Sequence, residues 1–297
     1  SSQQLLHSLV AGPVAVALVL LIGAGLMMQS FAKLLDVDPG FERSHLLPGT
    51  VDLSNVTYKD THTRDDLARQ LVERLESLPG VVSACGAHEL PLARPGRWTR
   101  IVIREDQKNA PPGTPLARSE IEPVTPEFFS TMQIPLLNGR AFTEWDLRES
   151  SPVAISNQKL ALRLWPDGES PVGKKIGVGH SLANSWRMLE VVGVVGDTRN
   201  LRLDQPGLAA VYFPFAQMWP GGTTILNPVV RTTSDPIELA EPMRREVLSI
   251  TGNEPVSNVR TIESIFEDSV ARAQFAMTIL GIFATIAVPR GQVGAPS

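Results

Sequence analysis

A run of twenty uncharged residues near the N-terminus, 9–28, constrains this chain more than any other feature of its sequence. At ~1.5 Å of rise per residue, a helix of this length reaches ~30 Å, the thickness of the hydrocarbon core of a bilayer. We therefore expect residues 1–32 to contain a transmembrane helix, with the polar body of the chain outside the membrane. Residues 1–8 contain no lysine or arginine, so the positive-inside rule assigns no orientation.

A cleaved secretory signal is the alternative interpretation of this run, with Ser30-Phe31-Ala32 as its cleavage site. A signal peptide has a basic start and an apolar stretch of ~7–15 residues. The run is longer than that, and the residues before it offer only His7 as a basic group. Both departures favour the transmembrane helix.

A second apolar run occupies residues 275–288. Its fourteen residues reach only ~21 Å as a helix, and Pro289 ends both the helix and the apolar character. We interpret the run as the start of a second transmembrane helix, followed by a tail at 289–297 that does not continue it. A buried core helix is the alternative, because apolar runs of this length commonly form one.

Nearly all charged residues lie in the body between the two apolar runs. All 31 acidic residues, and all lysines and arginines except Arg290, lie between Lys33 and Gln274. This mild acidity, without a basic stripe, excludes a nucleic-acid-binding role. Cys85 is the only cysteine, so no internal disulfide can form and the body must be stabilised by its core.

Two β-α-β units are predicted, one at each end of the body. In the first, an interrupted strand at 47–58 precedes a helix at 63–78 that opens on the capping-box pattern of Thr63 and Asp66, and a strand follows at 81–87. In the second, a strand at 224–232 precedes a helix that starts with Pro236, and residues 256–259 form the return strand. Pro242 should kink that second helix or delay its start to about residue 241.

The residues between these units, ~95–220, are rich in strands and turns. Short helices are predicted at 126–132 and 157–164. Runs of β-branched and aromatic residues bounded by turn residues predict strands at 98–104, 118–124, 152–156, 172–178, 187–195 and 209–214. The predicted class is α+β, with two β-α-β units bracketing an inserted strand-rich subdomain.

The body carries no motif that demands catalysis. Residues Gly168 to Lys174 fit the G-x-x-x-x-G-K start of a phosphate-binding loop, but Lys175 replaces the Ser/Thr that holds Mg²⁺, and a strand follows where a helix is needed. Cys85 sits among small residues of a predicted strand, which is typical of a structural thiol. Glu120 and Glu122 share one face of a strand, as solvated strand faces often show.

The histidines complete this search. They are scattered without the close spacing of metal ligands, at positions 7, 45, 62, 88 and 180. We therefore name no catalytic, cofactor-binding or metal-binding residue, expect no cofactor, and leave the binding residues unassigned.

Five ordered motifs carry a family resemblance, together with the apolar segment 18–31 and the Val37–Phe41 stretch that follows it. The motifs are Val124–Phe129, Ile134–Phe142 with Asp146, Pro171–Ile176, Val191–Arg199 and Val211–Gln217. They resemble the MacB-like periplasmic core domain of FtsX-type ABC transporter permeases, and among these the long bacterial permeases that contain two such halves.

The resemblance implies a non-catalytic permease component of an ABC transporter, placed in the bacterial inner membrane with most of the chain in the periplasm. The implied partners are a separate ABC ATPase, the remaining permease helices or a second permease half, and a periplasmic adaptor or substrate. Within the core at 33–274, segments 33–94 and 221–274 would form a porter-like subdomain around an insert at 95–220. Because the family continues with further helices, we expect this chain to be a truncated fragment.

The last predicted helix of the body suggests how movement could be transmitted. From the N-cap Thr261, apolar residues recur at helical spacing, and no proline or glycine intervenes before Gly281. Residues ~262–285 could form one rigid lever between the membrane and the body. A membrane-tethered sensor domain and an extracytoplasmic enzyme remain the alternatives; a downstream signalling module would mark the first, and a pocket with converging titratable groups the second.

Overall fold

The computed structural model divides the chain into two units, Ser1–Val37 with Phe266–Ser297, and Asp38–Ile265. It describes residues 22–23, 38–53, 61–91, 98–111, 114–179, 186–199, 207–218, 224–252 and 254–268. The two apolar runs lie outside the described residues, except for Ile22 and Gly23. Within the described ranges, no helix combines the length and apolar character needed to cross a membrane.

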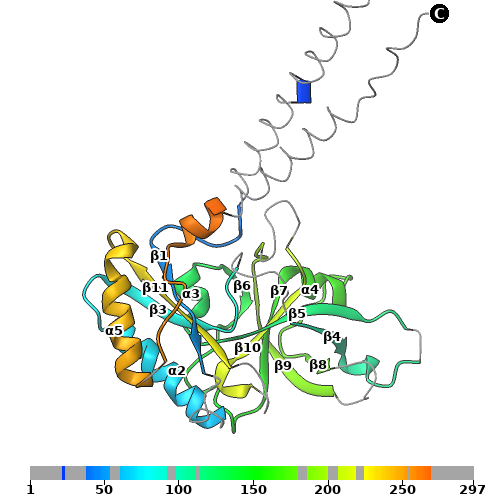
Figure 1. Cartoon of the computed structure of the whole chain (residues 1–297). Helices are drawn as coiled ribbons and strands as arrows, with labels where there is room; N and C mark the ends of the chain where they lie inside the picture. Colours follow the sequence, from blue (N-terminus) through cyan, green and yellow to red (C-terminus); the bar gives the residue numbers. More distant parts are fainter. Residues whose placement is uncertain are drawn as a thin grey trace, which may run out of the picture. The chain divides into compact units, whose positions relative to one another are not determined.

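The unit Asp38–Ile265 has mixed α and β structure, in which all the described strands belong to one connected set of pairings (Figure 1). The strands are β1 (Leu46–Pro48), β2 (Val51–Asp52), β3 (Val81–Ala87), β4 (Thr99–Arg104), β5 (Ala117–Val124), β6 (Leu136–Gly139), β7 (Val153–Asn157), β8 (Lys175–Gly179), β9 (Trp186–Val195), β10 (Ala210–Pro214) and β11 (Ile225–Thr232). The helices are α2 (Thr61–Glu76), α3 (Phe128–Met132), α4 (Gln158–Leu164) and α5 (Ala240–Thr251). Three 3₁₀ turns are η2 (Glu105–Gln107), η3 (Phe215–Gln217) and η4 (Pro236–Leu239).

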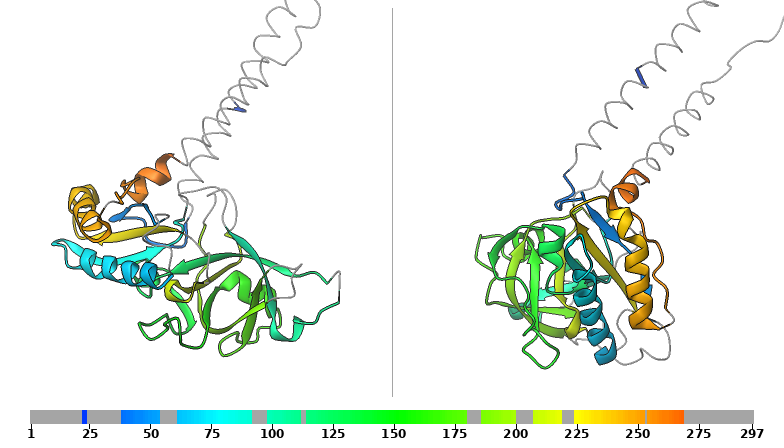
Figure 2. Two further views of the ribbon diagram at one scale, coloured as in Figure 1. Left: turned by 60° about the horizontal axis from the view of Figure 1, so that its bottom comes forward. Right: turned by 90° about the vertical axis from the view of Figure 1, so that its left-hand side faces the viewer.

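The two ends of the unit combine into what we call the α/β lobe, formed by β1, β3, β11, α2 and α5. β11 pairs antiparallel with β1 on one edge and with β3 on the other. Helices α2 and α5 lie side by side, and α2 packs on β3 and β11 (Figure 2). Alternation along β11 sends Val230 into the core shared with α2, whereas the next residue, Arg231, reaches α3 on the opposite face.

The remaining strands close on themselves and form what we call the barrel lobe. The pairings run β5-β10-β7-β9-β8-β4, and an additional antiparallel pairing of β4 with β5 closes the ring. Helix α4 packs against strands of this ring, and its buried residues Leu160 and Leu164 join the core. Asn157 caps α4 by accepting a hydrogen bond from the Leu160 N–H at 3.0 Å.

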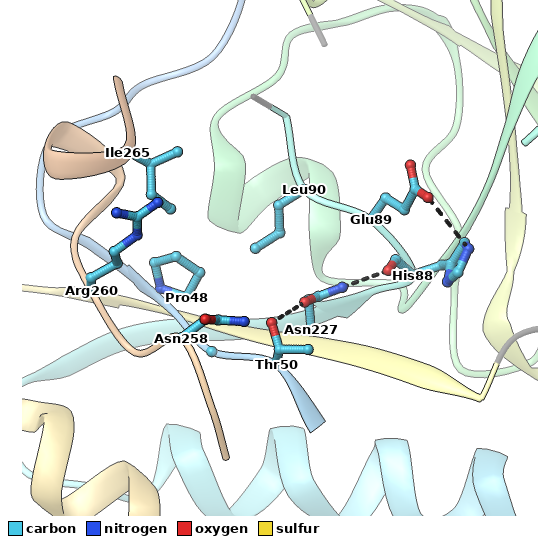
Figure 3. Close-up of a pocket in the computed structure, with 10 residues that line it drawn as sticks. Pro48, Thr50, His88, Glu89, Leu90, Asn227, Asn258, Arg260 and Ile265 are labelled. Atoms are coloured by element: carbon cyan, nitrogen blue, oxygen red, sulfur yellow. Dashed lines mark hydrogen bonds and ion pairs between the residues drawn. The ribbon is translucent and has the colours of Figure 1, made fainter. Parts of the chain in front are cut away.

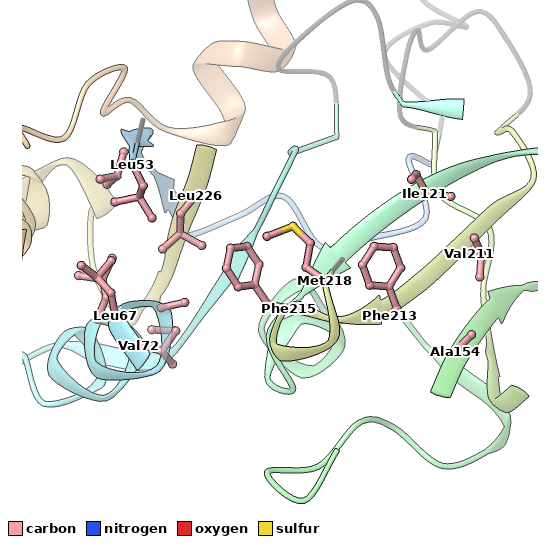
Figure 4. Packing of buried hydrophobic residues seen from close by; sticks show 14 of the residues in the cluster. Leu53, Leu67, Val72, Ile121, Ala154, Val211, Phe213, Phe215, Met218 and Leu226 are labelled. Atoms are coloured by element: carbon pink, nitrogen blue, oxygen red, sulfur yellow. The ribbon is translucent and has the colours of Figure 1, made fainter. Parts of the chain in front are cut away.

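Strand β5 connects the two lobes because it changes partner along one edge. Its first residues pair with β4, and its last residue, Val124, pairs with Ala87 of β3. Backbone hydrogen bonds reinforce the crossing, from the His88 N–H to the Pro123 carbonyl at 3.0 Å and from the Thr125 N–H to the Gly86 carbonyl at 2.9 Å. One hydrophobic cluster continues through both lobes (Figure 4). Relative movement of the lobes would therefore disturb a shared core.

Most of the predicted elements are present. The strand predicted at 81–87 is β3 with the same bounds, and those predicted at 98–104, 118–124, 187–195 and 209–214 differ from β4, β5, β9 and β10 by a single residue at one end. Pro242 lies in the first turn of α5, which begins at Ala240 after η4, so the delayed helix start is the correct alternative. Asp235 caps η4 by accepting from the Ile237 N–H at 3.1 Å.

Three local predictions are wrong. Residues 256–259 form no strand: only Ser257 makes a bridge, to Thr50, and Asn258 takes φ +52°, which ends the extended conformation. The second β-α-β unit therefore lacks its return strand, and β1 takes the outer position beside β11.

The other two errors concern boundaries. Helix α2 begins at Thr61, so Thr63 lies inside it and cannot be its N-cap; Asp66 pairs instead with Arg69 at 3.3 Å. The strand predicted at 172–178 begins only at Lys175, because residues 172 and 173 form a turn with Gly173 at φ +84°. β6 was not predicted at all, and its four residues are all exposed.

Candidate functional site

The loop that resembles a phosphate-binding motif, Gly168 to Lys174, contains two glycines in left-handed conformations. Gly168 and Gly173 take positive φ values of +83° and +84°, and the loop leads into β8 rather than into a helix. Lys174 forms an ion pair with Glu169. The loop therefore lacks the helix N-terminus that binds phosphate in nucleotide-binding proteins.

The expectation of a solvated face for Glu120 and Glu122 is wrong. Both residues are buried, with 1% and 2% of their surface exposed, so the faces on which they stand are covered. The Glu122 Oε1 accepts a hydrogen bond from the Glu89 N–H at 2.6 Å. This side-chain hydrogen bond adds to the backbone bonds that join β5 to the end of β3.

The two histidines whose side chains the structure describes, His45 and His88, make separate contacts. His45 has its Nδ1 3.0 Å from the Ser234 carbonyl, while the buried His88 stacks on Trp98 with ring centroids 4.5 Å apart. His7 and His180, and the side chain of His62, lie outside the described residues. In the described ranges, no three histidine, cysteine or acidic side chains are arranged to hold a metal ion.

Cys85 is a structural thiol. It is fully buried in β3, and burial, with a smaller contribution from the charge of Glu127, raises the pKa of the thiol far above its usual range. A thiol without thiolate character and without access to solvent does not react with alkylating reagents.

The motifs that carry the family resemblance meet in space. Phe128 and Phe129 from the first motif, Phe142 from the second and Tyr212 from the fifth form an aromatic cluster, with ring centroids 5.1–6.1 Å apart. Such pairs add about 0.5–1.5 kcal/mol beyond the area that they bury. The motifs therefore encode packing between loops and strands.

The second and fifth motifs also fix the loop at 143–151. Arg140 forms a bidentate ion pair with Asp146, at 2.7 and 2.9 Å, and Asp146 accepts from the Thr143 N–H. Burial alone would raise the pKa of Asp146, but these bonds outweigh it and lower the pKa. The buried Gln217 donates to the carbonyls of Leu147 and Ser151.

The residues Asp38–His45, which we call the leading segment, are fixed to several elements. Gly40 takes φ +82° and lies directly against the Asp197 carbonyl: a Cβ atom at Gly40 would stand 2.0 Å from that oxygen. The Arg199 N–H donates to the Pro39 carbonyl at 2.8 Å, and the Glu42 N–H donates to the Met132 carbonyl at 3.1 Å. The segment after the first apolar run thus contacts both the barrel lobe, at 197–199, and helix α3.

Arg231 ties the same segment to the α/β lobe. Its Nε donates to the Thr131 carbonyl at 2.7 Å, and its two terminal nitrogens donate to the carbonyls of Ser44 and Glu42 at 2.8 and 2.9 Å. Burial lowers the pKa of this guanidinium, and the nearby Glu42 opposes the shift. The sequence search missed Arg231, although a single arginine in the apolar strand β11 was a usable signal.

A small cavity of about 150 Å³ lies where residues 258–265 approach the sheet (Figure 3). Asn227 occupies its wall, accepting from the Thr50 hydroxyl at 2.8 Å and donating through its amide to the His88 carbonyl. Ser257 and Thr50 exchange two backbone hydrogen bonds of 2.8 Å. These contacts connect the segment after α5 with β1, β11 and the end of β3.

A second cavity, also of about 150 Å³, lies between the lobes, and we call it the α2 groove. One wall is α2, and the opposite wall is formed by residues 125–127, 143–147 and 214–216. Both walls contribute acidic and apolar lining residues, and Leu147 is 46% exposed there.

Known proteins resemble this chain both in sequence and in fold. The MacB-like periplasmic core domain model matches residues 7–250. The periplasmic region of MacB from Actinobacillus actinomycetemcomitans shares the fold, with a TM-score of 0.51 and 15% identity over 80% of this chain and 97% of that one. The extracellular domain of the noncanonic ABC-type transporter YknZ from Gram-positive bacteria gives 0.45 and 16%, over 73% and 100%. No curated protein matches the chain. The family match confirms the resemblance found in the motifs, and the chain belongs to the MacB-like periplasmic core domain family.

Proposed function

We propose that this chain is a non-catalytic permease component of an ABC transporter, and that its body transmits ATP-driven movement from the membrane to export or to partner proteins in the periplasm. The family match supports the transporter role. The observation that supports the mechanical role is that the leading segment forms hydrogen bonds with residues 197–199, with α3 and with Arg231 of β11. A pull on this segment would reach both lobes through hydrogen bonds and a shared core.

The proposed assembly follows from the sequence and the family. We propose that the apolar runs anchor the chain in the bacterial inner membrane, that a separate ABC ATPase supplies energy, and that further helices or a second permease half complete the membrane part. A periplasmic adaptor or substrate would receive the movement. The porter-like subdomain would consist of 33–94 and 221–274, and the insert would be 95–220, consistent with the α/β and barrel lobes.

The proposed lever begins in the described part of the chain. A helix starts at residue 262, and Thr261 caps it by accepting from the Ser264 N–H at 3.2 Å. This bond confirms the predicted N-cap. Residues 269–285 of the lever lie outside the described residues, so its continuation toward the membrane is part of the proposal.

A labelling experiment tests the location of the body. In the Trp145→Cys variant, a membrane-impermeant maleimide applied to intact cells with a permeabilised outer membrane should label the chain, because residue 145 is 75% exposed. The unmodified chain is the control: its Cys85 is buried and should stay unlabelled until denaturant is added. Labelling of the variant only after lysis of the inner membrane would contradict a periplasmic body.

A second experiment tests the lever in a complete permease of the family with its ATPase. A Gly-Gly insertion after the position of Ala273 should leave ATP hydrolysis running while periplasmic output falls at least ~10-fold, because glycines interrupt a rigid helix. The matched control is the same insertion after Asp167, in the exposed turn before Gly168. Unchanged output from the lever variant would refute the mechanism.

A further inference from the structure

The α2 groove combines acidic walls with an apolar lining. Six of its lining residues are acidic and one is basic. The acidic residues come from both walls: Asp65, Glu73 and Glu76 on α2, and Glu127, Glu144 and Asp146 opposite. The single basic residue, Arg69, already pairs with Asp66 and Glu73 at 3.3 and 3.1 Å. Asp146 pairs with Arg140 in the same way, at 2.7 and 2.9 Å. The six acidic lining residues still outnumber these two arginines, so the field inside the groove is negative and favours a cation.

The acidic groups act on one another. Burial is the main cause that raises the pKa of Glu127; hydrogen bonds from its own backbone and from Thr125 lower it, and the charges of Glu76 and Glu73 raise it. Nearby negative charges disfavour an ionised carboxylate, and a cation placed beside it would oppose that effect. The groove thus presents a local cost that an occupant of positive charge would remove.

The apolar part of the groove shows that the occupant is more than a simple ion. Val72, Pro214, Phe215 and Leu147 line it, and Leu147 remains 46% exposed. Trp145 on the same loop is 75% exposed. Exposed apolar side chains gathered beside a cavity mark interaction sites, because water is a poor neighbour for them. A small inorganic cation would satisfy the carboxylates and leave this surface uncovered.

We propose that the α2 groove binds a basic, partly apolar segment of a partner polypeptide. Lysine or arginine side chains of the segment would lie between Glu73 or Glu76 on α2 and Glu127 or Glu144 opposite, and its apolar side chains would cover Leu147. The groove lies between the lobes, so an occupant contacts both of them. This inference goes beyond the transmission role, and it can be measured without an ATPase.

Binding can be tested with the full chain in detergent micelles. The probe is a fluorescent short peptide of alternating lysine and leucine, followed by fluorescence anisotropy. The Glu73→Gln/Glu144→Gln variant removes one exposed carboxylate from each wall and should weaken binding about tenfold, and Leu147→Ser should weaken it severalfold. Raising the salt concentration should weaken binding to the native chain more than to the double variant.

Matched variants make the result decisive. Glu149→Gln/Glu238→Gln removes the same charge from exposed positions outside the groove, and Leu162→Ser changes an apolar residue that is 56% exposed on α4; neither should alter binding. Unfolding midpoints show that each variant is folded. Equal weakening by groove and control variants, equal binding of a glutamate–leucine peptide, or no binding to the native chain would each overturn the proposal. A chain that binds the peptide but fails the labelling or lever experiment would refute the proposed function alone.

Discussion

Replacing Gly40 by alanine should lower the free energy of unfolding by at least ~3 kcal/mol, a large loss for a single methyl group. The φ of +82° at Gly40 disfavours every L-residue, and the new Cβ would lie 2.0 Å from the Asp197 carbonyl oxygen. That oxygen belongs to the backbone, so neither side can yield by rotating a side chain. The leading segment should therefore separate from 197–199. Denaturant unfolding of the two chains measures the loss.

Gly80→Ala is the matched control for this prediction. Gly80 has a similar φ of +88°, but a Cβ built there meets no atom within 4 Å. Its cost should be limited to backbone strain, about 1–2 kcal/mol. The difference between the two variants isolates the contact with Asp197. Equal losses would show that the leading segment is not held tightly against the barrel lobe.

The same pair of variants separates stability from transmission. In a complete permease with its ATPase, Gly40→Ala should reduce periplasmic output far more than Gly80→Ala at a temperature where both remain folded. ATP hydrolysis should continue in both, because neither position belongs to the nucleotide-binding subunit. Equal output would place the path of movement elsewhere.

Much of the strand structure could be predicted because its signals are local. β9 and β10 are rich in valine and aromatic residues, and the strands β3, β9 and β10 each have a turn residue at one end: β3 begins after Gly80, β9 ends before Gly196 and β10 ends with Pro214. The closure of the barrel has no such signal. It depends on the first residues of β5 pairing with β4, and the connection to the α/β lobe depends on Val124 pairing with β3; both are contacts that periodicity within one strand does not reveal.

The burial of Glu120 and Glu122 could not be predicted either, because it too depends on contacts with other segments of the chain. A strand with two carboxylates at alternate positions looks like one with a solvated face, and the residues that cover this face come from elsewhere in the chain. Residues 256–259 fail for a different reason: their apolar spacing fits a strand, but Asn258 adopts a left-handed conformation that periodicity does not reveal. The α2 groove, formed by four separate segments, could not be predicted from any one of them.

Replacing Arg231 by methionine should lower the free energy of unfolding by about 3 kcal/mol. The variant fills much of the same space but leaves the carbonyls of Thr131, Ser44 and Glu42 without the donors that they have now. Buried carbonyl groups that lose a charged donor carry most of their desolvation cost. Arg231→Lys should recover part of the loss, since one ammonium group cannot reach three acceptors as the planar guanidinium does.

The opposite outcome has a definite physical meaning. Burial of the guanidinium is itself unfavourable, as the lowered pKa of Arg231 indicates, so an apolar replacement also removes a desolvation cost. If that cost equalled the stabilisation from the three hydrogen bonds, Arg231→Met would be as stable as the native protein. Arg231 would then contribute nothing to holding the leading segment on the sheet. Arg245→Met is the reference variant: its position on α5 is exposed, so the free energy of unfolding should change by close to zero. A loss at Arg231 that Arg245 does not share therefore measures how firmly the leading segment is held to the sheet, which a mechanical role requires.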